Sequence, residues 1–203
     1  MKKILVIITV GLLFATCTNN SSYEKEEFIV IQDITNNFLQ EILLTEEVRV
    51  IFDGEVMKYE PFNDTLHSRV YFSDALLPIS QVKKDFGWMF KDSYLGSNDS
   101  AIFYGIINSK QFYELKYRNF DKTKIELKKP LKQFNRSQER IITGERYAIF
   151  NFSRVCFDAK RENGVVVIEY TKGYENGTAT GYRNALLIKK QNGKWVYIKK
   201  RKH

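Results

Sequence analysis

The sequence is poor in residues that bind metals, act as general bases or form disulfides. Its 203 residues include two histidines and two cysteines. Serine-type nucleophilic catalysis needs an imidazole base, and only His67 and His203 could provide one. His67 follows the turn-like segment Pro61-Phe62-Asn63-Asp64 and His203 ends a basic tail, so we expect both at the surface. The composition therefore argues against a serine hydrolase.

Motifs for metals and phosphates are also missing. The chain has no Cys-x-x-Cys pair, no His-x-x-x-His pair and no calcium-loop pattern. Its glycine-rich stretch, residues 173–181, precedes a strand-like run, whereas a phosphate loop would precede a helix. Nothing in the sequence brings together two of the carboxylates in the predicted loops, which are Glu60, Asp64, Asp74, Asp85, Asp92 and Asp99. We predict no cofactor, no metal and no catalytic pair.

The longest apolar run is short. It covers residues 4–15, whereas a membrane-spanning helix needs about 20 apolar residues. Lys2 and Lys3 precede the run, and Thr16 and Cys17 follow it. A basic head, a short apolar core and a small-residue junction are typical of a secretion signal. We therefore expect an exported protein.

The segment Phe14-Ala15-Thr16-Cys17 resembles the lipobox of bacterial lipoproteins. The resemblance implies that residues 1–16 are a signal peptide and that Cys17 carries a lipid. It also implies that this lipid anchors the protein in the outer membrane of a Gram-negative bacterium. Thr16 and Phe14 depart from the usual lipobox residues, and an ordinary cleaved signal or an uncleaved anchor is the alternative. We predict a polar tether over residues 17–23 and one globular domain over residues 24–203.

Cys156 would then have no cysteine to pair with. It lies between Val155 and Phe157 in a strand-like run, so we interpret it as a small buried hydrophobe. The domain must be stabilised by its core and not by disulfides.

Positive charge predominates, with a net charge of +8. The excess is concentrated in residues 122–140 and 189–202. Basic segments bind nucleic acids, anionic lipids or acidic glycans, and an exported protein rarely meets nucleic acid. We therefore predict an envelope protein or an anionic polymer as partner. The candidate ligand-binding residues are Lys122, Lys124, Lys128, Lys129, Lys132, Tyr174, Tyr182, Lys199, Lys200, Arg201 and Lys202.

Hydrophobic spacing predicts the first elements. Apolar residues at spacings of three and four predict an amphipathic helix over residues 24–43. Asp53-Gly54 between alternating runs predicts a hairpin. Residues 68–72 form a short candidate strand, and Ser80 is predicted to cap a helix that extends to Lys91.

The middle of the chain is harder to assign. β-branched and aromatic residues predict a strand over residues 101–107, and residues 125–131 fit an edge strand interrupted by Pro130. Residues 109–120 fit a strand as well as they fit a helix capped by Ser109. The many aromatic side chains between Phe86 and Phe120 are either core residues or an exposed binding patch.

The last third predicts a β-meander. Strands are expected over residues 147–157, with a bend near Ser153, and over residues 165–170, 182–189 and 194–199, the last two joined by an Asn192-Gly193 turn. Trp195 and Val196 should face opposite sides of the sheet, so each side must be covered. The predicted fold class is α+β, with the N-terminal amphipathic helix packed on an antiparallel sheet that ends in this meander.

Residues 147–198 resemble a family of uncharacterised exported lipoproteins of the Bacteroidota type. The likeness rests on Ser153-Arg154-Val155-Cys156-Phe157-Asp158 and on Gly193-Lys194-Trp195. It implies a fold and an exported location but no reaction. Relatives often carry a cysteine pair in the glycine-rich loop, and residues 173–181 have none.

The sequence thus favours a non-enzymatic envelope protein that binds a partner protein or an anionic polymer. Two alternatives stay open: a hydrolase of envelope polymer, whose carboxylates only the fold would assemble, and a membrane-held immunity or inhibitor protein. The oligomeric state is open as well.

Overall fold

A computed structural model gives the fold of the chain. It describes residues 21–39, 47–53, 56–62, 69–91, 95–129, 131–134, 147–173 and 179–198. The predicted signal peptide, Cys17, Tyr174 and the basic residues 199–202 lie outside the described residues.

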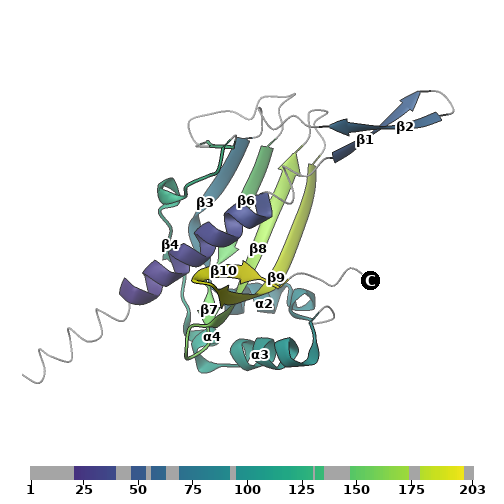
Figure 1. Cartoon of the computed structure of the whole chain (residues 1–203). Coiled ribbons are helices and arrows are strands. Elements are labelled where there is room, and N and C mark those ends of the chain that lie inside the picture. The colour runs from purple at the N-terminus through teal and green to yellow at the C-terminus, as the bar shows by residue number, and fades with distance from the viewer. Residues whose placement is uncertain are drawn as a thin grey trace, which may run out of the picture.

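An eight-stranded sheet forms the centre of the domain (Figure 1). Its strand order is β10-β9-β8-β6-β3-β4, with β5 paired to β3 and β7 paired to β8. The strands are β3 (Arg69–Leu77), β4 (Arg118–Asn119), β5 (Lys132–Gln133), β6 (Tyr147–Ser153), β7 (Cys156–Phe157), β8 (Asn163–Gly173), β9 (Ala179–Gln191) and β10 (Lys194–Tyr197). Pairing is antiparallel except that β3 runs parallel to β5 and β6. The predicted α+β fold with a C-terminal meander is confirmed.

The N-terminal helix, residues 21–39, crosses one face of this sheet (Figure 1). Its fully buried face, which includes Ile31 and Ile34, packs in a core cluster with Phe150 and Trp195. The predicted helix is confirmed over residues 24–39. Residues 21–23, which the sequence predicts as part of the tether, are helical as well, and residues 40–43 of the predicted helix lie outside the described residues.

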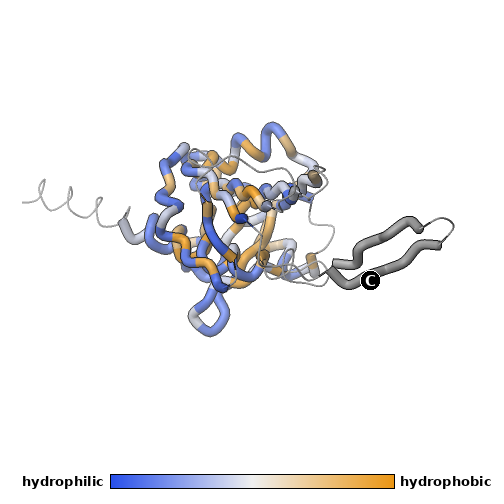
Figure 2. Tube along the Cα trace, turned by 90° about the horizontal axis from the view of Figure 1, so that it is seen from above, coloured by the Kyte–Doolittle hydropathy of each residue, from blue (hydrophilic) through white to orange (hydrophobic). Residues whose placement is uncertain are grey.

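Shorter helices pack against the opposite face: α2 (Ile79–Asp85), α3 (Ser97–Ile107) and α4 (Lys110–Glu114), with the 3₁₀ turn η1 (Gly87–Phe90). Phe103 and Phe112 are buried there in a second core cluster with Val167 and Leu187. The central strands thus bury apolar side chains on both faces, and Figure 2 shows the hydrophobic segments gathered inside the domain. Among the described residues, no helix is both long and apolar enough to cross a membrane.

Two predicted turns are confirmed. Strand β1 (Glu47–Asp53) pairs antiparallel with β2 (Val56–Phe62), with Asp53 opposite Val56, as the predicted hairpin requires, and Gly54 itself lies outside the described residues. Asn192 and Gly193 both have positive φ, 51° and 78°, as the turn between β9 and β10 requires. The predicted bend near Ser153 is also present, because β6 ends there and β7 begins at Cys156.

Three local predictions are wrong. Residues 101–107 are helical, because Phe103, Ile106 and Ile107 form one buried face against the sheet. Helix α2 begins at Ile79 after Pro78, without a side-chain cap from Ser80, and ends at Asp85 well before the predicted end. Among residues 125–129 and 131, none is in a strand; the short 3₁₀ helix η2 (Lys122–Lys124) precedes them and β5 follows.

Residues 109–120 contain both a helix and a strand, the two structures that the sequence allowed. Ser109 caps α4 by accepting a hydrogen bond from the Phe112 N–H at 3.3 Å. The chain then turns extended and forms β4, which pairs with Ala75 and Leu76 of β3.

Candidate functional site

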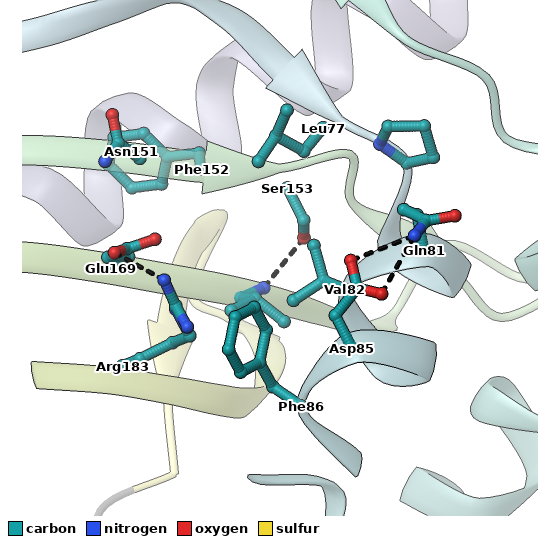
Figure 3. Close-up of a pocket in the computed structure, with 12 residues that line it drawn as sticks. Leu77, Gln81, Val82, Asp85, Phe86, Asn151, Phe152, Ser153, Glu169 and Arg183 are labelled. Atoms are coloured by element: carbon teal, nitrogen blue, oxygen red, sulfur yellow. Dashed lines mark hydrogen bonds and ion pairs between the residues drawn. The ribbon is translucent and has the colours of Figure 1, made fainter.

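A pocket lies between α2 and the sheet, on the face opposite the N-terminal helix (Figure 3). Its volume is about 220 Å³. Strands β6, β8 and β9 form its floor, and the end of β3 and helix α2 form its other walls. Four segments that are far apart in the sequence therefore meet there.

A β-bulge in β3 shapes this pocket. Phe72 pairs with Phe150 and Leu76 pairs with Phe152, so three residues of β3 lie opposite Asn151 alone. Such an irregularity bends a strand and re-aims the chain that follows it. Here the chain turns into α2 directly after Leu77, whose carbonyl accepts a hydrogen bond from the Arg154 N–H at 2.7 Å.

Glu169 and Arg183 form one polar end of the pocket (Figure 3). They are directly paired residues of β8 and β9, and the Arg183 Nη2 lies 2.5 Å from the Glu169 Oε1. The Arg183 guanidinium also stacks on the Phe86 ring, 3.7 Å from its centroid. An ion pair and a cation–π contact together fix the guanidinium plane.

Gln81 and Asp85 form the opposite end, one turn apart on α2 (Figure 3). The Gln81 Nε2 donates to both Asp85 oxygens, at 3.0 and 2.9 Å. Asn151 faces the pocket from β6, and its side chain has no hydrogen-bond partner in the described part of the chain.

Ser153 lines the pocket without the properties of a nucleophile. Its hydroxyl donates to the Arg154 carbonyl at 2.9 Å and accepts from the Val167 N–H at 2.8 Å. The hydroxyl proton is thus engaged with the backbone, and a nucleophilic serine needs a base in that place. The serine instead supports the break between β6 and β7.

Sequence reasoning missed most of this site. Of the carboxylates considered there, Asp85 lines the pocket, and its nearest acidic partner in the lining is Glu169. A signal was present: Glu169 interrupts an otherwise apolar strand, and such a residue needs a partner. The partner, Arg183, follows only from the register of β8 and β9.

The predicted lysine site is separate from this pocket. It lies beside β3, with which β5 and its residue Lys132 pair. Residues 126–128 run along the N-terminal helix, which holds their backbone through side-chain amides. The Gln32 Nε2 donates to the Glu126 carbonyl at 2.7 Å, and the Glu126 N–H donates to the Gln32 Oε1 at 2.8 Å. The Asn36 side chain accepts from the Lys128 N–H at 3.2 Å and donates to the Glu126 carbonyl at 3.0 Å. This pairing with side chains explains why the segment is not a strand.

Buried anchors flank the held segment. Ile125 and Leu131 are 5% and 6% exposed and belong to the core under the N-terminal helix. The lysines point outward between and beside them: Lys124, Lys128, Lys129 and Lys132 are exposed and Lys122 is half-buried. We call these five residues the lysine strip. Lys124 pairs with Asp121 at 3.2 Å, and no other lysine of the strip forms an ion pair with a described residue.

Of the predicted site residues outside the strip, the structure describes Tyr182, which lies in β9 and not beside the strip. Tyr182, which is 51% exposed, stacks on Tyr170 in β8 at a centroid distance of 5.1 Å. The described chain ends at Ile198, just after β10, and β10 is the opposite edge strand to β4 in the sheet order.

The aromatic residues of the middle region divide between core and surface. Phe90, Phe103, Phe112 and Phe120 are buried, whereas Trp88, Tyr104, Tyr113 and Tyr117 are exposed. The aromatic residues of this region are therefore part core and part surface, with Phe86 half-buried between the two.

Among the described residues, no three His, Cys, Asp or Glu side chains gather as a metal site would require. No protein-family profile matches the chain, and no curated protein or solved structure is significantly similar to it.

Proposed function

We propose that the protein is a lipid-anchored, non-enzymatic envelope protein that binds an anionic polymer through the lysine strip. The observation that supports this proposal is the clamp by Gln32 and Asn36 on the backbone of residues 126–128. A loop ordered before binding loses less conformational entropy when a ligand arrives. The hydrogen bonds from Gln32 and Asn36 therefore order this segment, which has no regular secondary structure, so that its lysines are already held in place before a ligand binds.

Charge supports the same function. Three strip lysines, Lys128, Lys129 and Lys132, have no acidic partner among the described residues, so their charge is available to a polyanion. Clustered lysines on one segment raise the local concentration of an anionic ligand and accelerate its association. Such binding weakens as salt screens the charges.

Binding to a sulfated polysaccharide tests this function. We would measure the affinity for dextran sulfate of the wild type and of the variant Lys128→Gln, Lys129→Gln, Lys132→Gln. A control with the same change in net charge is Lys84→Gln, Lys160→Gln, Lys194→Gln, which replaces exposed lysines of other elements. The strip variant should bind at least about tenfold more weakly than the control, and added salt should remove the difference. Equal affinity of the two variants would refute the lysine strip as the binding surface.

The anchor is a separate part of the proposal. A lipid on Cys17 would lie four residues before residue 21, the first described residue of the helix, a span of at most about 14 Å. The domain would then stay at the membrane surface, within reach of envelope polymers. Incorporation of labelled palmitate and membrane fractionation of wild type and Cys17→Ala test the anchor. Label and membrane association should disappear together in the variant, and a variant that behaves like the wild type would refute lipidation at Cys17.

The pocket gives little support to the hydrolase alternative, although Asp85 and Glu169 both line it. A general acid needs an unpaired carboxyl in apolar surroundings. Glu169 is held by Arg183, and Asp85 is exposed and held by Gln81.

A further inference from the structure

The pocket beside α2 is independent of the lysine strip, and its chemistry points to a different ligand. It is a cavity with planar polar side chains at both ends and apolar side chains between them (Figure 3). The apolar part comes from Leu77, Pro78, Val82, Phe86 and Val167. Cavities of this composition are typical of small-molecule sites.

Glu169 and Arg183, the charged residues in the interior of the lining, compensate each other, and the one further charge, on Asp85, is exposed to solvent. Glu169 is neutralised by Arg183 at 2.5 Å, and the exposed Asp85 carboxylate is solvated and held by Gln81. An ionic ligand would either break the Glu169–Arg183 pair or bring an unpaired charge against apolar walls, and both are costly. The pocket therefore favours a ligand without net charge.

The remaining hydrogen-bonding groups are a mixture of donors and acceptors. The Asn151 amide offers both, and in the described chain it has no hydrogen-bond partner. Arg183 uses its Nη2 for Glu169, and its other guanidinium N–H groups have no hydrogen-bond partner among the described residues. The carboxylates of Glu169 and Asp85 retain free lone pairs. Hydroxyl groups, which donate and accept at once, match such a set.

The volume of the pocket further limits which ligands can fit. Pockets for drug-sized molecules are about 300–1,000 Å³, and this one is about 220 Å³. The pocket suits a molecule of one ring, with hydroxyls toward the two polar ends and its carbon face toward Val82 and Val167. We infer that the pocket binds one neutral sugar unit, free or at the end of a glycan, with Asn151 and Arg183 as the main hydrogen-bonding residues.

Titration calorimetry with glucose, galactose, mannose and N-acetylglucosamine tests the inference on the whole chain. One of these sugars should bind with a Kd on the order of 1 mM, and the affinity should not change with salt, because the ligand is neutral. Salt-independent binding separates this site from the lysine strip, so either proposal can fail alone.

Asn151→Ala is the decisive variant, because the side chain has no hydrogen bond to lose within the described fold. The control is Asn184→Ala, an exposed asparagine next to Arg183 in the chain that is not part of the pocket lining. Asn151→Ala should weaken sugar binding about tenfold and Asn184→Ala should leave it unchanged. Absence of binding to all four sugars, equal binding by Asn151→Ala, or binding only of the charged probes putrescine or acetate would each overturn the inference.

Discussion

Glu27 and Arg154 form a buried ion pair between residues 127 positions apart in the sequence. The Arg154 Nε lies 2.8 Å from one Glu27 oxygen and 3.1 Å from the other. The same carboxylate accepts from the Val155 N–H and from Arg118, both at 2.8 Å. The pair thus joins the first turns of the N-terminal helix to the break between β6 and β7.

Glu27→Ala should lower the free energy of unfolding by about 3–5 kcal/mol. The Glu27 side chain is fully buried and Arg154 is 11% exposed, so the variant leaves a guanidinium without its counter-charge inside the protein. Urea denaturation followed by tryptophan fluorescence measures the loss, since Trp195 is buried under the same helix.

Glu24→Ala is the matched control. Glu24 lies one turn earlier on the helix, is 49% exposed and contacts Arg118 at 3.4 Å. Exposed ion pairs contribute less than about 1 kcal/mol, so the control should unfold nearly as the wild type does. Similar losses in both variants would contradict a special role for Glu27.

A second prediction concerns pH and Glu26, which binds the last hairpin. Its carboxylate accepts from the Lys190 Nζ at 2.7 Å and from the Trp195 indole N–H at 2.8 Å. Burial of Glu26 opposes its ionisation, but these hydrogen bonds, with the charges of Lys190 and Arg161, lower the pKa below its ordinary 4.5. The carboxylate therefore stabilises the fold fully above that pH, and the stabilisation is lost as the pH falls below it.

Glu26→Gln isolates this contribution. The free energy of unfolding of wild type and variant is compared by urea denaturation between about pH 7 and about pH 3. The wild type should be the more stable near neutral pH, and the difference should shrink as the pH falls. A difference that stays constant over this range would show that the charge of Glu26 does not contribute.

The parts of the fold that could be predicted are those with a strong local pattern. The N-terminal helix has a regular apolar face, and the C-terminal meander has continuous apolar runs separated by turn residues. The Asn192-Gly193 turn was predictable because both positions need positive φ, which these residues tolerate.

The middle of the chain could not be predicted locally because tertiary contacts decide its structure. Ile106 and Ile107 favour a strand by propensity, yet their burial against the second face of the sheet stabilises a helix. The backbone of residues 126–128 forms no strand and is hydrogen-bonded to Gln32 and Asn36, about 90 positions away. Likewise, the pocket needs the bulge at β3 and the register of β8 and β9, and neither leaves a mark in the sequence.

A third prediction is that Cys156 reacts very slowly with thiol reagents in the folded protein. Burial raises the pKa of its thiol to about 11, although a contact with the Ser109 hydroxyl at 3.8 Å acts in the opposite direction. At pH 8 only about a thousandth of such a thiol is ionised, and the thiolate is the reactive form.

Iodoacetamide labelling of the Cys17→Ala variant measures this reactivity, because Cys156 is then the remaining cysteine. The native protein should react at least about a hundredfold more slowly than the same protein unfolded in urea. Adding Ser109→Ala should keep the reaction slow, since the surrounding core still covers the sulfur. Comparable rates in the native and unfolded states would mean that the thiol is accessible.

The last prediction is that one chemical change has opposite effects at two glycines. Gly193 has a φ of 78°, and a Cβ added there meets no other atom within 4 Å, so Gly193→Ala costs backbone strain alone. The expected loss of stability is about 1 kcal/mol. Gly105 lies inside α3, where an added Cβ also meets nothing within 4 Å, and alanine is favoured over glycine in a helix by about 1 kcal/mol. Gly105→Ala should therefore raise the urea midpoint and Gly193→Ala should lower it. Because both variants add one methyl group in open space, shifts of the same sign would contradict the backbone conformations on which the hairpin and the helix depend.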